Sequence, residues 1–202
     1  MTGLLVLDHV FCMVPPDGDW AARLAQAGWL LDGGTRHAGQ GTRNRRLVLA
    51  EHYLELVWVE DAAEARANPL RLDRRADRQR TGASPFGIGL RGTPPEDERA
   101  HYRLHEGLGF PLWVHRDDEA APERPLVVVL DLPEGAPRRP ATAPVNPGRL
   151  LAVRHTGPSP ASMPAFSGPS YEWRAGEHRL EVVTDAGPSV TLTDVLAVVA
   201  GP

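Results

Sequence analysis

The spacing of apolar and polar residues divides the chain into short strand-like runs separated by polar or proline-rich breaks. The first run, residues 4–14, carries one imidazole near its middle, His9. A later run, Tyr53–Val59, carries one carboxylate, Glu55, among apolar side chains. An ionised carboxylate is costly to bury without a partner. We therefore predict two strands of one sheet that point His9 and Glu55 into a shared cavity.

One short helix and further strands are expected between these two runs. Trp20 and Leu24 lie on one helical face, and Gly28 suits the left-handed position after a helix end, which predicts a helix over residues 19–27. Its cap is expected at Asp17 or Asp19. The other expectations are strands over residues 29–31 and 47–49 and an irregular, glycine-rich loop over residues 33–44.

A charged stretch over residues 61–82 interrupts the pattern and is predicted to be a helical connection between two halves. Beyond it the pattern resumes, with a helix expected over residues 96–106. The strands expected in this part cover residues 86–91, 110–114, 126–130, 150–153 and 190–199, and residues 170–173 and 179–184 are expected to form a hairpin.

The two halves match in outline when Pro15-Pro16 is aligned with Pro94-Pro95. Each half has an apolar strand, a Pro-Pro break, an acidic helix start, a glycine stop and an aromatic residue that opens the next strand. Such self-similarity predicts a duplicated unit, with chance similarity in an alanine-, glycine- and proline-rich chain as the alternative. The alignment places Ile88 where the first half has His9, so no metal-ligating residue is expected there.

The composition is that of a soluble globular protein, since 42% of the 202 residues are hydrophobic and 24% are charged. The formal net charge of −4 gives no bulk attraction to polyanions, so no nucleic-acid partner is expected. No signal peptide and no membrane-spanning apolar run are apparent, so no membrane partner is expected and the cytoplasm is the default location. The residue bias suggests GC-rich bacterial coding DNA, and a monomer or homodimer is expected.

The missing residue types exclude several kinds of chemistry. All 22 basic residues are arginine, which rules out a Schiff-base lysine and a phosphate-loop lysine. The single cysteine, Cys12, rules out an internal disulfide and a cysteine-rich zinc site. We expect Cys12 to be a small buried hydrophobe rather than a nucleophile.

Several motifs of the first half occur in an order that is similar to a known family. The motifs Leu7-Asp8-His9-Val10, Ala27-Gly28-Trp29 and Tyr53-Leu54-Glu55-Leu56 together resemble the first βαβββ module of the vicinal-oxygen-chelate superfamily. More narrowly, the chain resembles its glyoxalase-like domain branch in His37-x-Gly39-x-Gly41-Thr42-x-Asn44 followed by Leu54-Glu55-Leu56.

The resemblance implies an α+β fold in which two βαβββ modules form a cup-shaped open barrel with a C-terminal β extension. The first module is then expected over residues 1–60, the helical connection over 61–82, and the second module with its hairpin extension over 83–202. Together they are expected to make one glyoxalase-like domain.

The resemblance also implies where a metal would bind, because metal-binding members carry ligands on the first and last strands of each module. His9 and Glu55 occupy those places in the first module, and imidazole and carboxylate suit zinc, iron, manganese or nickel. Glu181 is a third candidate ligand if the C-terminal strands close the cup. No cofactor is certain. The alternatives to a divalent metal are a metal-free His9–Glu55 acid–base pair, and a buried structural pair in which loop N–H groups or Arg43 satisfy Glu55.

A second group of candidates surrounds the glycine-rich loop. Its histidine, arginine and asparagine offer donors for a carboxylate, carbonyl or hydroxyl group, and glycine lets the backbone approach a ligand closely. The predicted ligand-binding residues are His37, Gly41, Thr42, Arg43, Asn44, Trp58 and Glu181. The alternatives are a loop that packs only against its own backbone and a tryptophan that only fills the core.

These candidates favour an enzyme with His9 and Glu55 as catalytic residues. It would perform proton-transfer, isomerase, lyase or dioxygenase-like chemistry on a small carbonyl or hydroxy compound. The alternative is a non-catalytic module that sequesters a drug or metabolite, favoured by apolar space around Ile88 and its flanking glycines. A third interpretation is an interaction protein that uses the arginine-rich segment 70–80, although a charged run is usually a solvated face.

Overall fold

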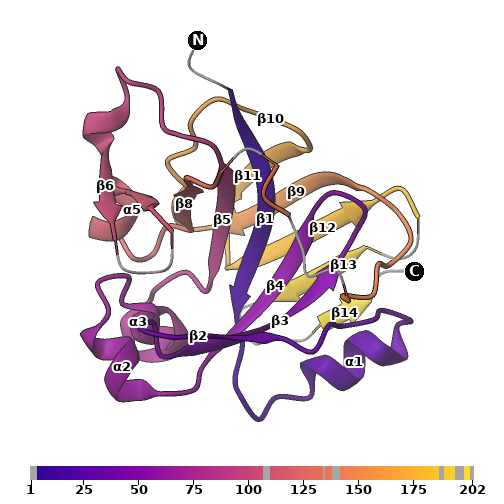
Figure 1. The fold of residues 1–202 in the computed structure, drawn as a ribbon. Coiled ribbons are helices and arrows are strands. Elements are labelled where there is room, and N and C mark those ends of the chain that lie inside the picture. Colours follow the sequence, from indigo (N-terminus) through magenta and orange to yellow (C-terminus); the bar gives the residue numbers. More distant parts are fainter. Residues whose placement is uncertain are drawn as a thin grey trace.

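A nine-stranded sheet, here called the large sheet, forms the centre of the computed structural model and curls into a half-barrel (Figure 1). The structure describes residues 4–106, 110–133, 135–137, 142–186 and 189–193, together with the backbone of residues 198–200. None of the helices within these ranges is long and apolar enough to cross a membrane.

Two sets of four strands build the large sheet. The first strand set is β1 (Leu5–Met13), β2 (Thr35–His37), β3 (Thr42–Val48) and β4 (Tyr53–Val59). The second strand set is β5 (Phe86–Arg91), β6 (Tyr102–His105), β7 (Leu112–His115) and β8 (Leu126–Leu130). The spatial order is β2-β3-β4-β1-β5-β8-β7-β6, and β1 and β5 pair antiparallel at the junction. The second strand set thus repeats the strand order of the first, which agrees with the predicted architecture of two βαβββ-like units in one curled sheet.

A five-stranded small sheet covers one face of the large sheet (Figure 1). Its order is β11 (Ser170–Ala175), β9 (Leu150–Gly157), β12 (Arg179–Thr184), β13 (Val190–Thr193) and β14 (Val198–Ala200), while β10 (Phe166–Ser167) pairs with β1. The predicted hairpin of β11 and β12 is wrong, because the two strands flank β9 on opposite sides, β11 parallel and β12 antiparallel to it.

The two faces of the large sheet bury different clusters. On the sandwich face, toward the small sheet, Val10, Leu54 and Ile88 belong to one core cluster with Leu180 and Val182 of β12. Strand alternation sends the neighbouring side chains to the other face, here called the cup face. A second cluster lies there and includes Phe11, Met13, Val57, Val128 and Leu72.

The helices within the described residues are short, and the connection helix that carries Leu72 packs on the cup face against β1 and β4. The helices are α1 (Trp20–Gln26), α2 (Ala62–Ala67), α3 (Leu72–Ala76), α4 (Arg78–Thr81) and α5 (Arg116–Ala120), with a 3₁₀ turn over Arg99–His101. The predicted first helix is confirmed, and its buried residues are Trp20 and Leu24. Asp19 stands at its N-cap but its carboxylate does not cap the helix, because it pairs with the Arg23 guanidinium at 2.7 Å.

The helix expected over residues 96–106 and the strand expected over residues 29–31 are both wrong. The helix expected over residues 96–106 is replaced by the 3₁₀ turn and β6, because this segment supplies the antiparallel partner that the backbone of β7 needs. Leu104, in β6, is 38% exposed. The strand expected over residues 29–31 is a loop in which the Leu30 N–H donates to the Asn146 side chain at 2.7 Å.

Candidate functional site

The polar network on the cup face begins with an irregularity in β1. The pairing of β1 with β5 shifts between Leu7, opposite Leu90, and His9, opposite Gly89, which leaves Asp8 as an inserted residue. A bulge of this kind adds one residue and re-aims the side chains around it. Both Leu7 and Val10 therefore face the sandwich core. Asp8 and His9 instead contact each other, with 3.0 Å between Asp8 Oδ2 and His9 Nδ1.

The imidazole of His9 is clamped between two neighbouring strands. Its ring stacks on the Tyr53 ring of β4, with 4.6 Å between centroids and an interplanar angle of 7°. On the other side, a Cβ atom on Gly89 of β5 would collide with the His9 ring. His9 is only 5% exposed. The missing side chain at position 89 is thus what makes room for this ring.

The structure brings His9 and Glu55 together, because they lie on adjacent parallel strands and on the same face. His9 Nε2 is 3.6 Å from Glu55 Oε2, an ion-pair distance that is too long for a good hydrogen bond. On the other side of the carboxylate, Asn44 donates its amide to Oε1, and His37 Nε2 lies 3.6 Å from the same oxygen. The Glu55 side chain is 13% exposed, so solvent or a ligand can reach a carboxylate that two imidazoles and an amide surround.

His37, Thr42 and Asn44 belong to the edge hairpin of β2 and β3, where an irregular loop was expected. His37 Nδ1 lies 3.0 Å from Thr42 Oγ1, and His37 Nε2 lies 3.2 Å from the Asn44 amide nitrogen. Asn44 Oδ1 accepts from the Thr35 N–H at 2.7 Å. The hairpin therefore holds its own polar groups in place and presents His37, whose side chain is 23% exposed, at the rim of the site.

Arg91 of β5 joins this network from the second strand set. Its Nε lies 3.0 Å and its Nη2 lies 2.9 Å from Asp8 Oδ1, while its Nη1 donates to the Ala136 carbonyl at 2.6 Å. Asp8 itself is 1% exposed. A buried carboxylate is tolerated here because both of its oxygens have partners, the guanidinium on one and the imidazole on the other.

Burial opposes the charged forms of Asp8 and His9, yet their mutual interaction dominates. For Asp8, the hydrogen bond and charge of His9, helped by Arg91, outweigh burial and lower the carboxyl pKa to about 2. For His9, the hydrogen bond to Asp8 and the charges of Glu55 and Asp8 outweigh burial and raise the imidazole pKa. Burial and then the charges of Glu55 and Asp8 raise the Tyr53 pKa well above its usual value, so its hydroxyl stays protonated. The surroundings thus favour a charged imidazole between two carboxylates.

Four of the predicted ligand-binding residues lie apart from this network, and three of them come from the first half of the chain. Arg43 points away from Glu55 and pairs with Glu60 at 3.2 Å. Trp58 faces the sandwich core and packs on Trp20, with 5.8 Å between ring centroids. Gly41 is a turn residue with a φ of 67°, and a Cβ there would collide with the backbone of α2.

Glu181 is not brought to His9 and Glu55. It lies in β12 of the small sheet between Leu180 and Val182, which both face the sandwich core, so its own side chain points away from the large sheet. There it pairs with the Arg154 guanidinium at 3.5 Å. The C-terminal strands cover the sandwich face rather than close the cup, which is why this candidate ligand fails.

The donor set does not fit a divalent metal of the kind that the family implies. In the second strand set, the cup-facing positions of β5 and β8 hold Gly87, Gly89 and Val128, none of which binds metal. Across the described ranges, no three histidine, cysteine, aspartate or glutamate side chains are grouped to hold a metal ion. His37 Nε2 is engaged by the Asn44 amide nitrogen at 3.2 Å, so His9 Nε2 and Glu55 remain as two donors, and two donors hold a divalent ion poorly.

The register at the β1–β5 junction corrects the predicted match between the halves. Ile88 pairs with Val10 and faces the sandwich core, so it is not the counterpart of His9 on the cup face. The glycines beside it do not leave apolar space, because the Phe11 ring covers Gly87 and the His9 ring covers Gly89. The apolar space that favoured a non-catalytic binding module is therefore already filled by these two rings.

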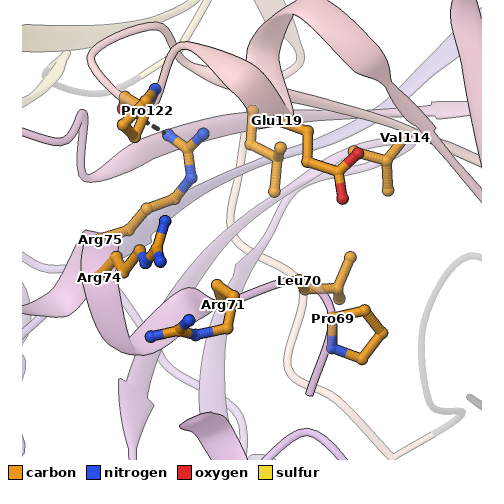
Figure 2. A pocket seen from close by; sticks show the side chains of 9 residues that line it. Pro69, Leu70, Arg71, Arg74, Arg75, Val114, Glu119 and Pro122 are labelled. Atoms are coloured by element: carbon orange, nitrogen blue, oxygen red, sulfur yellow. Dashed lines mark hydrogen bonds between the residues drawn. The ribbon is translucent and has the colours of Figure 1, made fainter. Parts of the chain in front are cut away.

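A separate pocket of about 160 Å³ lies between the connection helices and the second strand set (Figure 2). Three of its charged lining residues already have partners: Arg71 pairs with Asp73 at 2.9 Å, Glu119 pairs with Arg103 at 3.3 Å, and the buried Arg75 donates to main-chain carbonyls, among them Asp118 at 3.0 Å. The pocket is lined by Pro69, Leu70, Arg71, Arg74, Arg75, Val114, Glu119, Pro122 and Leu126, so it shares no residue with the His9–Glu55 network.

Asp8, Tyr53 and Arg91 are parts of the network that sequence reasoning missed. Asp8 had a signal, because two adjacent polar residues in an apolar strand break the alternation and indicate a bulge. Tyr53 had one too, since it lies two positions before Glu55 and therefore on the same face of the strand. Arg91 had none, because only the pairing of β1 with β5 brings it to Asp8.

Several solved structures are similar to this chain at low identity. A hypothetical protein from Staphylococcus aureus is 13% identical, with 77% of this chain and 70% of that chain covered and a TM-score of 0.47. Methylmalonyl-CoA epimerase from Mycobacterium tuberculosis is 17% identical, with 66% and 93% covered and a TM-score of 0.44. The same enzyme from Streptomyces coelicolor is 13% identical, with 63% and 97% covered and a TM-score of 0.40. No functional conclusion follows from similarity at this level.

The comparison with curated proteins gives no match. The family model described as "Glyoxalase-like domain" matches residues 7–131, which is more than half of the chain. This range contains nearly all of both strand sets and every residue of the network from Asp8 to Arg91. From this match, which covers more than half of the chain, the chain belongs to the glyoxalase-like domain family.

Proposed function

We propose that the chain is an enzyme that moves a proton on a small carbonyl or hydroxy compound, by isomerase or lyase chemistry. The observation that carries the proposal is the line Asp8–His9–Glu55, in which a buried imidazole is fixed at Nδ1 and directs Nε2 toward a partly exposed carboxylate. A positioned carboxylate beside an imidazole is suited to general acid–base catalysis.

Glu55 is the group that takes the proton from the substrate. Its side chain is 13% exposed, whereas Asp8 is buried and fully engaged with His9 and Arg91. Its contacts with the two imidazoles and the hydrogen bond from the Asn44 amide hold the Glu55 carboxylate in one orientation. A fixed orientation lowers the entropy cost of bringing base and substrate together.

His9 lies behind Glu55 and tunes it. The raised pKa of His9 favours the protonated imidazole, which places a positive charge next to the carboxylate. His37 occupies the other side of Glu55 at the rim, where a substrate oxygen can approach its more exposed ring. In this arrangement Glu55 and His37 contact the substrate and His9 acts through Glu55.

The test is the exchange of carbon-bound hydrogen in D₂O. The protein is incubated with a panel of carbon acids, comprising 2-hydroxyketones, 2-oxo acids and methylmalonyl-CoA, and deuterium incorporation is measured by NMR and mass spectrometry. We expect the wild type to label at least one class and Glu55→Gln to label none. The matched control is Glu172→Gln, which removes a surface carboxylate paired with Arg154 at 3.4 Å and should keep the wild-type rate.

Two results would contradict the proposal. One is the absence of labelling by the wild type across all three compound classes. The other is labelling by a folded Glu55→Gln variant at the wild-type rate, which would show that the base lies elsewhere. Far-UV circular dichroism and a thermal melt establish that each variant is folded.

A further inference from the structure

We propose that Arg91, from the second strand set, is a positioning residue of the His9–Glu55 site: it fixes Asp8, and Asp8 fixes the imidazole of His9 toward Glu55. The inference rests on the proposed function, which assigns the proton transfer to Glu55 and the tuning of Glu55 to His9. It gives the second strand set a role in the site, although the cup-facing residues Gly87, Gly89 and Val128 of β5 and β8 include no acid or base.

The first link joins Arg91 to Asp8. Nε and Nη2 of the guanidinium approach the same carboxylate oxygen, Asp8 Oδ1, at 3.0 and 2.9 Å. The remaining arm of the guanidinium is anchored on the Ala136 carbonyl at 2.6 Å. Because the guanidinium is planar and held at both ends, it leaves Asp8 little freedom to rotate.

The second link joins Asp8 to His9. With Oδ1 occupied by Arg91, the other oxygen, Oδ2, lies 3.0 Å from His9 Nδ1. A carboxylate accepts only, so this contact requires a hydrogen on Nδ1. A partner on one ring nitrogen sets both the orientation of the ring and the role of the other nitrogen. Nε2 is therefore the atom that faces Glu55.

The position of Arg91 follows from the fold. It lies opposite Val6 in the antiparallel β1–β5 pair, next to the bulge that turns Asp8 out of the regular pairing. The nearer cup-facing positions of β5, Gly87 and Gly89, are kept small by the rings of Phe11 and His9. Arg91 is thus the β5 side chain that reaches the network, and it does so through Asp8.

The test compares Arg91→Gln with Arg91→Lys and Asp8→Asn. The matched control is Arg154→Gln, which removes an ion-paired arginine from the small sheet on the far side of the molecule. The first measurement needs no substrate: NMR of ¹⁵N-histidine-labelled protein detects the His9 Nδ1–H proton, assigned by its loss in His9→Gln. A buried imidazole N–H bonded to a carboxylate gives a downfield resonance that exchanges slowly with water.

We expect this resonance to move upfield or vanish in Arg91→Gln and Asp8→Asn, to recover partly in Arg91→Lys, and to stay unchanged in Arg154→Gln. In the deuterium-exchange assay, Arg91→Gln should lower kcat by about 10- to 100-fold while KM changes little, which is the size expected from a small misplacement of a catalytic group. A purely structural arginine would lower the melting temperature without changing the resonance of the remaining folded protein.

An unchanged His9 Nδ1–H resonance in folded Arg91→Gln would overturn the proposal, and so would an unchanged kcat. If Arg91→Gln does not fold, Arg91→Lys decides in the same way, because a lysine keeps the charge and loses the planar contact. Failure of the wild type to label any carbon acid would contradict the proposed function alone, since the NMR measurement is made without substrate.

Discussion

In the first strand set, the cup-facing positions of β1 and β4 include the polar residues His9, Tyr53 and Glu55, whereas the cup-facing positions of the matching strands β5 and β8 include Gly87, Gly89 and Val128. The strand order is the same in both sets, and the first strands of the two sets, β1 and β5, pair antiparallel at the junction. The fold therefore does not require a polar site. It requires two curled strand sets that join along β1 and β5, and the candidate acid and base lie in the first set.

The difference also shows how the two sets depend on each other. The rings of His9 and Phe11 lie across the junction on the glycines of β5, and Arg91 reaches back from β5 to Asp8. The first strand set thus supplies His9 and Glu55 of the candidate site, and the second supplies the space and the guanidinium that hold them. A site divided in this way predicts that different substitutions will damage activity and stability separately.

The largest effects should separate the two strand sets. Glu55→Gln should lower the rate of deuterium exchange by about 10²- to 10⁴-fold, the usual contribution of a general base, with little loss of stability. Val128→Ala, on the buried cup face of β8, should lower the free energy of unfolding by about 2 kcal/mol through loss of packing and leave the rate nearly unchanged. Urea denaturation and exchange rates are measured for both variants. A large rate loss in Val128→Ala would show that the apolar cup face of β8 also affects proton transfer.

The next effect comes from filling the space on the second strand set. Gly89→Ala places a methyl group against the His9 ring, so we expect a loss of about 1–3 kcal/mol of stability together with a lower exchange rate. Gly33→Ala is the control, because nothing lies within 4 Å of a Cβ at that position. Thermal melts measure the stability of both variants, and the deuterium-exchange assay measures their rates. Equal melting temperatures for the two variants would contradict the close packing of His9 on β5.

The sequence alone predicted the parts of this arrangement that depend on local periodicity. One imidazole and one carboxylate in two apolar runs, each on the buried face of a strand, were enough to predict that His9 and Glu55 meet. The helix at residues 19–27 was predicted from the spacing of Trp20 and Leu24 and from Gly28. In these cases neighbours along the chain carry the signal, because strand and helix periods fix which side chains share a face.

Parts that depend on pairing between distant strands were not predictable in this way. Arg91 meets Asp8 only because β5 pairs with β1, and Glu181 faces away only because β12 pairs with β9. The segment over residues 96–106 carried helix signals, yet its backbone is used as the strand partner of β7. In each case a tertiary contact outweighs a local preference.

A smaller effect should come from pH, through two buried histidines with opposite environments. His9 has carboxylate partners and a raised pKa, so its contribution to stability is present below pH 6.5 and is lost as pH rises through its folded pKa. His155, between the sheets, has its pKa lowered to about 4 by burial and then by the charge of His178. Its neutral form is the one that fits the fold, so His155 costs stability as pH falls from about 6.5 toward 4.

His155→Phe should therefore flatten the acid side of the stability profile. The gain in the free energy of unfolding from this substitution is expected to be about 2 kcal/mol larger at pH 5 than at pH 7.5, because pH 5 lies one and a half pH units below the ordinary histidine pKa. The substitution also removes the contact of His155 Nδ1 with the Tyr171 hydroxyl, 3.4 Å away, which lowers stability equally at both pH values. The measurement is urea denaturation at the two pH values, and an unchanged difference between them would contradict a neutral, buried His155.

The smallest effect should come from Arg43, which the sequence placed among the ligand-binding residues. Its guanidinium pairs with Glu60 at 3.2 Å on the exposed side of β3 and faces away from Glu55. Exposed ion pairs contribute about 0–1 kcal/mol, so Arg43→Gln should change the free energy of unfolding by less than about 1 kcal/mol and leave the exchange rate unchanged. Asn44→Ala is its matched neighbour, since Asn44 donates to Glu55 and its loss should slow exchange. Similar rates for these two variants would show that the face of β3 does not decide which residues belong to the site.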